Sequence, residues 1–193
     1  MRPRPHPAPL VGVLLLLAAC GHSPPSRFFT LDAAPPAEPA PGRAAVAPVQ
    51  LDAVHIPAAV DRPEMVTRTG PARVQISGQD RWAAPLGEMM RRVLAQDLAS
   101  RLPQGAFVFP DAPSPEGARG LVVTVLQLTA APDGRVDLQA SWSLLDPGSN
   151  RSVGGDNLRL SATAGPGSAG QAQALSAVLG QLADRIADAI RRG

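Results

Sequence analysis

The single cysteine, Cys20, is the residue whose chemistry the sequence defines most sharply. It follows a basic start that carries Arg2 and Arg4 and an apolar run over residues 10–19. A basic start, a short apolar run and small residues before the cleavage point are typical of a secretory signal peptide. We therefore predict a signal peptide over residues 1–19, too short to cross a ~30 Å hydrocarbon core as a helix.

Residues 17–20 spell Leu-Ala-Ala-Cys, which resembles a bacterial lipobox. The resemblance implies that a lipid is attached to the Cys20 thiol, that cleavage precedes Cys20 and that the new amine is acylated. An ordinary signal peptide with a chance cysteine is the alternative. More than one acyl chain makes membrane attachment stable. Gly21 stands where lipoproteins of the inner membrane usually carry Asp, which favours an outer-membrane anchor and a domain that faces the periplasm.

Other residue types that could do chemistry do not form a recognisable constellation. The candidates are His22, His55, Asp52, Asp61, Ser143 and Ser161. The two histidines lie in different predicted segments, the aspartates have no partner pattern, and the serines have no base to activate them. The sequence contains no P-loop, nucleophile elbow or Rossmann fingerprint. We expect a protein that is not an enzyme, with no metal and no cofactor beyond the covalent lipid on Cys20.

The charge balance argues against a nucleic-acid partner. The predicted signal peptide holds two of the 18 basic residues, which leaves 16 arginines against 16 acidic residues. The mature chain therefore has no net basic field to attract a polyanion. With one cysteine there is no intramolecular disulfide and no thiolate zinc site, so the fold must depend on packing.

The mature chain divides into a tether and a domain. Residues 20–48 are predicted to hold the lipidated cysteine, a tether and a Pro-rich connector. Within them, residues 28–31 read Phe-Phe-Thr-Leu. We predict a short strand docked on the domain, because two adjacent phenylalanines are β-prone and favour burial. Residues 49–193 are predicted to form one globular domain of ordinary size.

Periodicity predicts strands and two amphipathic helices in that domain. The predicted strands cover residues 49–56, 65–69, 73–77, 106–109, 121–128, 135–144 and 157–164. Residues 78–80 are expected to lead into a helix over residues 85–102, and a glycine-rich loop over 165–170 to precede a second helix that ends at Arg192. On the first helix, Glu88, Arg91, Arg92 and Asp97 are expected to be solvated. The predicted fold is α+β: a single two-layer domain, with a mostly antiparallel sheet and both helices packed on one face.

Two further segments resemble a known family. With the lipobox and residues 28–31, they resemble the ABC-type transport auxiliary lipoproteins, the PqiC-like outer-membrane lipoproteins of MCE-type lipid transport systems. The matching residues are Asp61, Arg62, Pro63, Val66, Arg68, Arg81, Trp82, Ala83, Pro85 and Leu86. The chain departs from the family pattern at Ala59, where an aromatic residue is common, and at Val60, where the family has Leu.

The resemblance implies an accessory component that docks a periplasmic MCE-domain protein at the outer membrane. ATP hydrolysis would belong to another subunit, and self-association into a homo-oligomer is left open. Two alternatives remain. One is a lipid-binding carrier whose sheet and helices enclose an acyl chain. The other is an envelope structural lipoprotein without a transport role.

We take Arg62, Pro63, Arg68, Arg81 and Trp82 as hypothetical partner-binding residues. Each has a structural alternative. Asp61 and Arg62 would form a local pair that fixes the turn at Pro63, and Trp82 would wedge the first helix onto the sheet.

Overall fold

The computed structural model describes residues 24–36, 46–149 and 151–192. The predicted signal peptide and Cys20 lie outside the described residues. The described parts form eight strands and two helices. In chain order they are β1 (Arg27–Phe29), β2 (Val49–His55), β3 (Glu64–Gly70), β4 (Arg73–Trp82), α2 (Leu86–Arg101), β5 (Phe107–Val108), β6 (Arg119–Ala130), β7 (Arg135–Leu145), β8 (Ser152–Thr163) and α3 (Gly167–Arg192).

The strands lie in two mixed sheets. A five-stranded sheet has the order β5-β2-β6-β7-β8, in which β2 is parallel to both β5 and β6 and the last three strands form an antiparallel meander. A smaller sheet has the order β1-β4-β3, with β1 parallel to β4. The predicted α+β class is confirmed, but the strands form two sheets where the sequence pattern predicted one. Parallel pairs arise here because each joins strands that are separated by a long stretch of chain.

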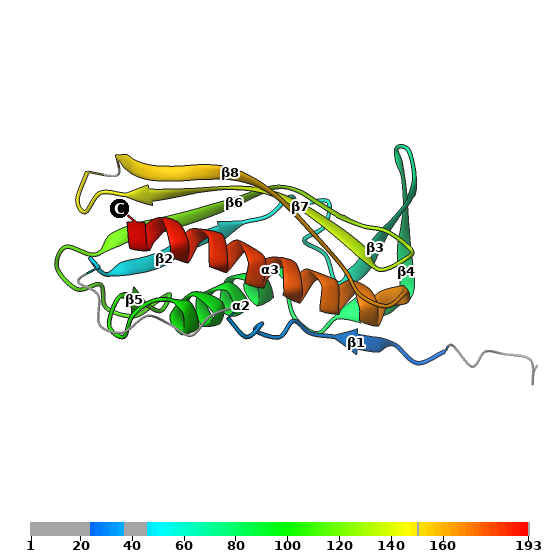
Figure 1. Cartoon of the computed structure of the whole chain (residues 1–193). Helices are drawn as coiled ribbons and strands as arrows, with labels where there is room; N and C mark the ends of the chain where they lie inside the picture. Colours follow the sequence, from blue (N-terminus) through cyan, green and yellow to red (C-terminus); the bar gives the residue numbers. More distant parts are fainter. Residues whose placement is uncertain (1–23, 37–45, 150, 193) are drawn as a thin grey trace, which may run out of the picture.

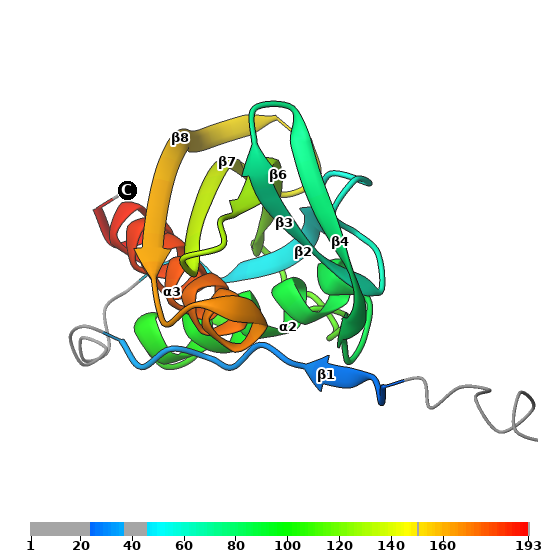
Figure 2. The same ribbon diagram turned by 90° about the vertical axis from the view of Figure 1, so that its right-hand side faces the viewer.

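Helices α2 and α3 cover one face of the five-stranded sheet, side by side (Figures 1 and 2). The even-numbered residues 136–144 of β7 point into the core, whereas the odd-numbered residues face away, as their alternation predicted. The apolar stripes of both helices meet this face, and Leu94, Leu98 and Leu182 are fully buried. The core therefore lies mainly between the helices and the larger sheet, and Leu31, Met65 and Trp82 extend it to the smaller sheet and the segment after β1.

The prediction that residues 78–80 leave the sheet is wrong, because β4 continues to Trp82. Its last residues pair with β1 in the register Arg27–Asp80, Phe28–Arg81 and Phe29–Trp82. This docked strand was predicted from residues 28–31. Its partner comes from more than 50 residues along the chain, so local periodicity around Asp80 could not reveal the pairing.

The second helix begins earlier than predicted, at Gly167, inside the segment expected to be a loop. The reason is a close approach of two backbone segments. A Cβ atom at Gly170 would lie 1.3 Å from the carbonyl oxygen of Gly165, so the helix can begin beside that turn only because residue 170 has no side chain.

Two turns of the meander offer a test of how glycine supports the fold. Gly134, between β6 and β7, has φ +83° and Gly148, between β7 and β8, has φ +76°. A left-handed residue with a side chain costs roughly 1–2 kcal/mol. A Cβ at position 148 would meet nothing within 4 Å, whereas one at position 134 would lie 2.1 Å from the Gly165 carbonyl oxygen. In urea unfolding, Gly148→Ala should lose about that much stability, and Gly134→Ala should lose clearly more. Equal losses would contradict the close approach seen at Gly134.

Candidate functional site

Residues 30–36, which follow β1, form a segment that we call the N-terminal strap. It runs along both helices (Figure 1). The backbone N–H of Asp32 donates to Ser176 Oγ of α3 at 3.2 Å, and that of Ala34 donates to Asp97 Oδ1 of α2 at 2.8 Å. Ala34 also lies against Gly180, where a Cβ would come within 2.7 Å of the Ala34 methyl group. The strap is therefore held by backbone hydrogen bonds as well as by packing.

The strap is fixed by a buried ion pair on α2. Asp97 and Arg101, one turn apart, are 0% and 3% exposed, with 3.4 Å between Arg101 Nη1 and Asp97 Oδ1. The Arg101 guanidinium donates to the carbonyl oxygens of Ala34 and Pro35 at 3.1 and 3.3 Å, and its Nε donates to Asp184 of α3 at 2.5 Å. The expectation that Asp97 is solvated is wrong, because the strap covers it.

Burial raises the pKa of Asp97 to about 6. The positive charge of Arg101 and the N–H of Ala34 act in the opposite direction and favour the carboxylate. Asp184 adds a further negative charge nearby, which raises the pKa again. This carboxyl therefore changes charge at a mildly acidic pH, in contact with the strap.

Three of the predicted partner-binding residues lie at the start of the smaller sheet. Arg62 Nε donates to Glu64 Oε2 at 3.0 Å, and Arg81 Nη2 lies 3.6 Å from Glu64 Oε1. The hydrogen bond from Arg62 is the main cause that lowers the pKa of Glu64. Pro63 is exposed between them, and its carbonyl oxygen accepts a hydrogen bond from the Trp82 N–H at 2.8 Å. Both arginines are thus engaged by one carboxylate.

Asp61 and Arg62 do not pair with each other in the structure, contrary to the structural alternative. Asp61 Oδ1 instead accepts a hydrogen bond from the backbone N–H of Gly87 at 3.3 Å, in the first turn of α2. The residue that precedes this helix, Pro85, makes no side-chain cap. Asp61 therefore satisfies a free N–H of the helix from 26 residues away, a role that a local capping pattern cannot show.

Arg68 differs from the other two arginines. It is exposed on β3 and stands directly opposite Val74 of β4. Val74 and Ile76 are 58% and 45% exposed, on a hairpin that projects beyond the core (Figures 1 and 2). Within the described residues Arg68 forms no ion pair. We call Arg68, Val74 and Ile76 the hairpin patch.

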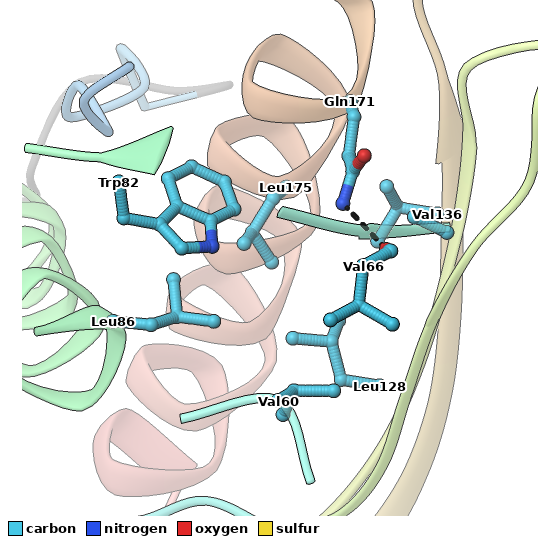
Figure 3. Close-up of a pocket in the computed structure, with 9 residues that line it drawn as sticks. Val60, Val66, Trp82, Leu86, Leu128, Val136, Gln171 and Leu175 are labelled. Carbon is cyan, nitrogen blue, oxygen red and sulfur yellow. Dashed lines mark hydrogen bonds between the residues drawn. The ribbon is translucent and has the colours of Figure 1, made fainter. Parts of the chain in front are cut away.

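Trp82 belongs to the core. Its side chain is 5% exposed and packs with Leu86 and Leu175 around a gap of about 20 Å³ (Figure 3). Gln171 closes this gap from α3, since its amide donates to the carbonyl oxygen of Val66 at 3.1 Å. Such a volume holds about one water molecule. Trp82 lies between the sheet and α2, as the structural alternative proposed, and its side chain offers almost no surface to a partner.

The remaining candidates are dispersed. His55 is exposed at the end of β2. Among the described residues, no group of three or more His, Cys, Asp or Glu side chains could hold a metal ion. No helix in the same parts of the chain is long and apolar enough to cross a membrane.

Comparisons with known proteins agree on the fold. A family model described as "ABC-type transport auxiliary lipoprotein component" matches residues 29–187. A crystal structure of a Xanthomonas campestris protein of the DUF330 family superposes with TM-score 0.69 at 15% identity, over 86% of this chain and 97% of that one. A crystal structure of an uncharacterized protein gives TM-score 0.63 at 19% identity, over 88% and 98% of the two chains. No curated protein matches the sequence.

The buried Asp97 predicts a pH dependence of stability. Its pKa of about 6 in the folded state exceeds the value near 3.9 of an unfolded aspartate, so the folded protein binds this proton more tightly. Asp97 therefore makes the free energy of unfolding greatest below about pH 4 and lowers it as the pH rises through about 6. Asp97→Asn removes this effect, and its stability relative to wild type should rise by up to about 3 kcal/mol between pH 4 and pH 7.

Urea unfolding of wild type and Asp97→Asn between pH 4 and pH 7 measures the difference in their free energies of unfolding. Carboxyl groups remote from Asp97 titrate equally in both proteins and cancel. Glu88→Gln, an exposed change on the same helix, is the control and should show no such trend. A constant difference between Asp97→Asn and wild type would show that Asp97 does not bind a proton more tightly in the folded state.

Proposed function

The chain belongs to the family of ABC-type transport auxiliary lipoprotein components, and we propose that it docks the periplasmic MCE-domain protein of a lipid transport system at the outer membrane. Lipid on Cys20 would provide the anchor, and the folded domain would provide the docking surface. Its role is attachment rather than catalysis, and ATP hydrolysis belongs to another subunit of the system.

The position of β1 supports a docking surface close to the anchor. Arg27, the first residue of β1, is seven residues from Cys20, and a fully extended chain of that length spans at most about 25 Å. Arg27 is tied to the domain by the pairing of β1 with β4 and by an ion pair with Asp80 at 2.6 Å. β1 begins at the same end of the molecule as the β3–β4 hairpin (Figure 1). An anchor at Cys20 would therefore hold the base of this hairpin near the membrane surface.

The hairpin patch is the observation that carries the proposal. Two exposed apolar side chains, Val74 and Ile76, lie beside Arg68 on a projecting hairpin. Arg62 and Arg81 are paired with Glu64, so Arg68 is the one of these three arginines that is left to bind a carboxylate of a partner. We expect the partner surface to present an apolar contact flanked by an acidic side chain. Arg62, Pro63 and Arg81 would shape the base of this contact.

The core gives less support to a carrier that encloses an acyl chain. The gap beside Trp82, between the helices and the sheets, measures only about 20 Å³. An acyl chain inside the domain would have to displace closely packed side chains such as Leu86 and Leu175. A docking role needs no such rearrangement.

In-cell photo-crosslinking tests the docking surface. A photoreactive residue in place of Arg68 or Ile76 should capture the MCE-domain protein, identified by mass spectrometry. The same residue in place of Arg159, which is exposed on β8, is the matched control and should not capture it. Arg68→Glu should also reduce co-purification of the partner several-fold. Capture from position 159 with none from 68 or 76, in cells that contain folded protein, would contradict the proposed surface.

The anchor has its own test. Cys20→Ser removes the thiol that would carry the lipid, so the protein should disappear from the outer-membrane fraction and its mass should lack the acyl groups. Thermal unfolding of the domain should be unchanged, since the described strands and helices are built from residues that follow Cys20. Retention of Cys20→Ser in the outer-membrane fraction would contradict anchoring through this residue.

A further inference from the structure

A hollow of about 420 Å³ lies where α3 ends, between its last turns, β7 and the first half of β8. Its apolar lining includes Trp142, Leu144, Leu158 and Ile190. It is at the opposite end of the molecule from the start of β1, where the C-terminus lies in Figure 1. A volume of this size is within the range of about 300–1,000 Å³ found for small-molecule sites.

The hollow exists because β8 loses its large side chains toward this end. Leu158 and Leu160 fill the inner face of β8 opposite Ala140 and Leu138, but Gly154 is the residue opposite Leu144. A Cβ at position 154 would lie 3.8 Å from Leu144 Cδ1, an ordinary packing distance. The space beside Leu144 could therefore have been filled by a side chain without a clash.

Three arginines surround this apolar lining. Arg119 extends from the start of β6, and Arg185 and Arg192 from α3. Asp156, which stands opposite Trp142 in the sheet, is the single acidic residue among the lining residues, so one carboxylate faces three guanidinium groups. In the described parts of the chain none of the three arginines forms an ion pair. The hollow therefore carries an excess of positive charge over an apolar floor.

Trp142 adds a second, independent feature. Its side chain is 5% exposed and lines the hollow, and its indole N–H is buried with no acceptor among the described residues. Buried N–H groups almost always have a hydrogen-bond partner in folded proteins. An unpartnered donor at this position fits a site whose acceptor comes from a bound molecule.

We propose that this hollow binds an anionic phospholipid. The arginines would hold its phosphate, the indole N–H of Trp142 would donate to an ester carbonyl oxygen, and Leu144 and Leu158 would contact the first part of an acyl chain. Most of the chain would stay outside, since the hollow opens to the surface. This site is separate from the hairpin patch, and it gives the domain a direct contact with lipid at the end that is remote from β1.

Titration of the full chain carrying Cys20→Ser with short-chain phosphatidylglycerol, below its micelle concentration, tests the proposal by calorimetry. We expect saturable binding at one site, with binding at least tenfold weaker for phosphatidylcholine and for inorganic phosphate. Arg119→Gln combined with Arg192→Gln should weaken binding at least tenfold. Gly154→Val should also weaken binding at least tenfold, because the valine side chain fills the hollow. The thermal unfolding midpoint of this variant should equal or exceed that of the parent.

Arg159→Gln, which removes an arginine from the outer face of the same strand, is the matched control and should bind like the parent. Absence of saturable binding would overturn the proposal, as would binding that Gly154→Val leaves intact. Equal binding of inorganic phosphate would also overturn it, because the site would then bind anions without using its apolar floor. Equal binding of phosphatidylcholine would overturn it as well, because the arginines would then not select an anionic lipid. None of these results depends on the docking crosslinks, which report on the other end of the molecule.

Discussion

The buried pair of Asp97 and Arg101 is the interaction on which the arrangement of this domain most depends. Two charged groups on one turn of α2 are almost fully removed from water, and such groups are tolerated only when other groups solvate them. Here the strap supplies backbone N–H and carbonyl groups, and α3 supplies Asp184. Removal of one partner from a buried pair typically costs about 3–5 kcal/mol, since the other charge remains buried. The helix layer and the strap therefore depend on each other.

This dependence extends to the smaller sheet and to the anchor. Because the strap is held against α2 and α3, β1 is held beside β4, and β4 gains a partner for its last residues. The small sheet in turn carries the hairpin patch. A lipid on Cys20 would consequently act on a short segment ahead of β1, instead of on a long free tether that reaches to β2. The position of the hairpin relative to a membrane would then follow from a buried ion pair on the helix that comes after it in the chain.

Local patterns in the sequence were sufficient to predict some elements and insufficient for others. The periodicity of α2, α3 and the meander reports which side of each element is buried, and this is a local property. Phe28 and Phe29 were enough to predict a docked strand, although Phe28 is largely exposed, Phe29 is partly buried and Leu31 is the fully buried residue of this stretch. The prediction that Asp97 is solvated was wrong, because its burial comes from a strap more than 60 residues away in the sequence. Arg101 at i+4 was the available signal, since an Asp and an Arg at this spacing can form a pair within one helix.

The two proposed functional surfaces, the hairpin patch and the arginine-lined hollow, lie in different parts of the fold. The gap beside Trp82 measures only about 20 Å³, whereas both surfaces lie where elements end or extend beyond the core. The hairpin patch exists because β3 and β4 continue past the last residues that the core can cover. The arginine-lined hollow exists because β8 carries Gly154 where another large side chain would have continued the core. The hairpin patch thus exposes apolar side chains that the core does not cover, whereas the hollow lacks a side chain that would fill it. Because they lie at opposite ends of the domain, a protein bound at one end would not obstruct a lipid at the other.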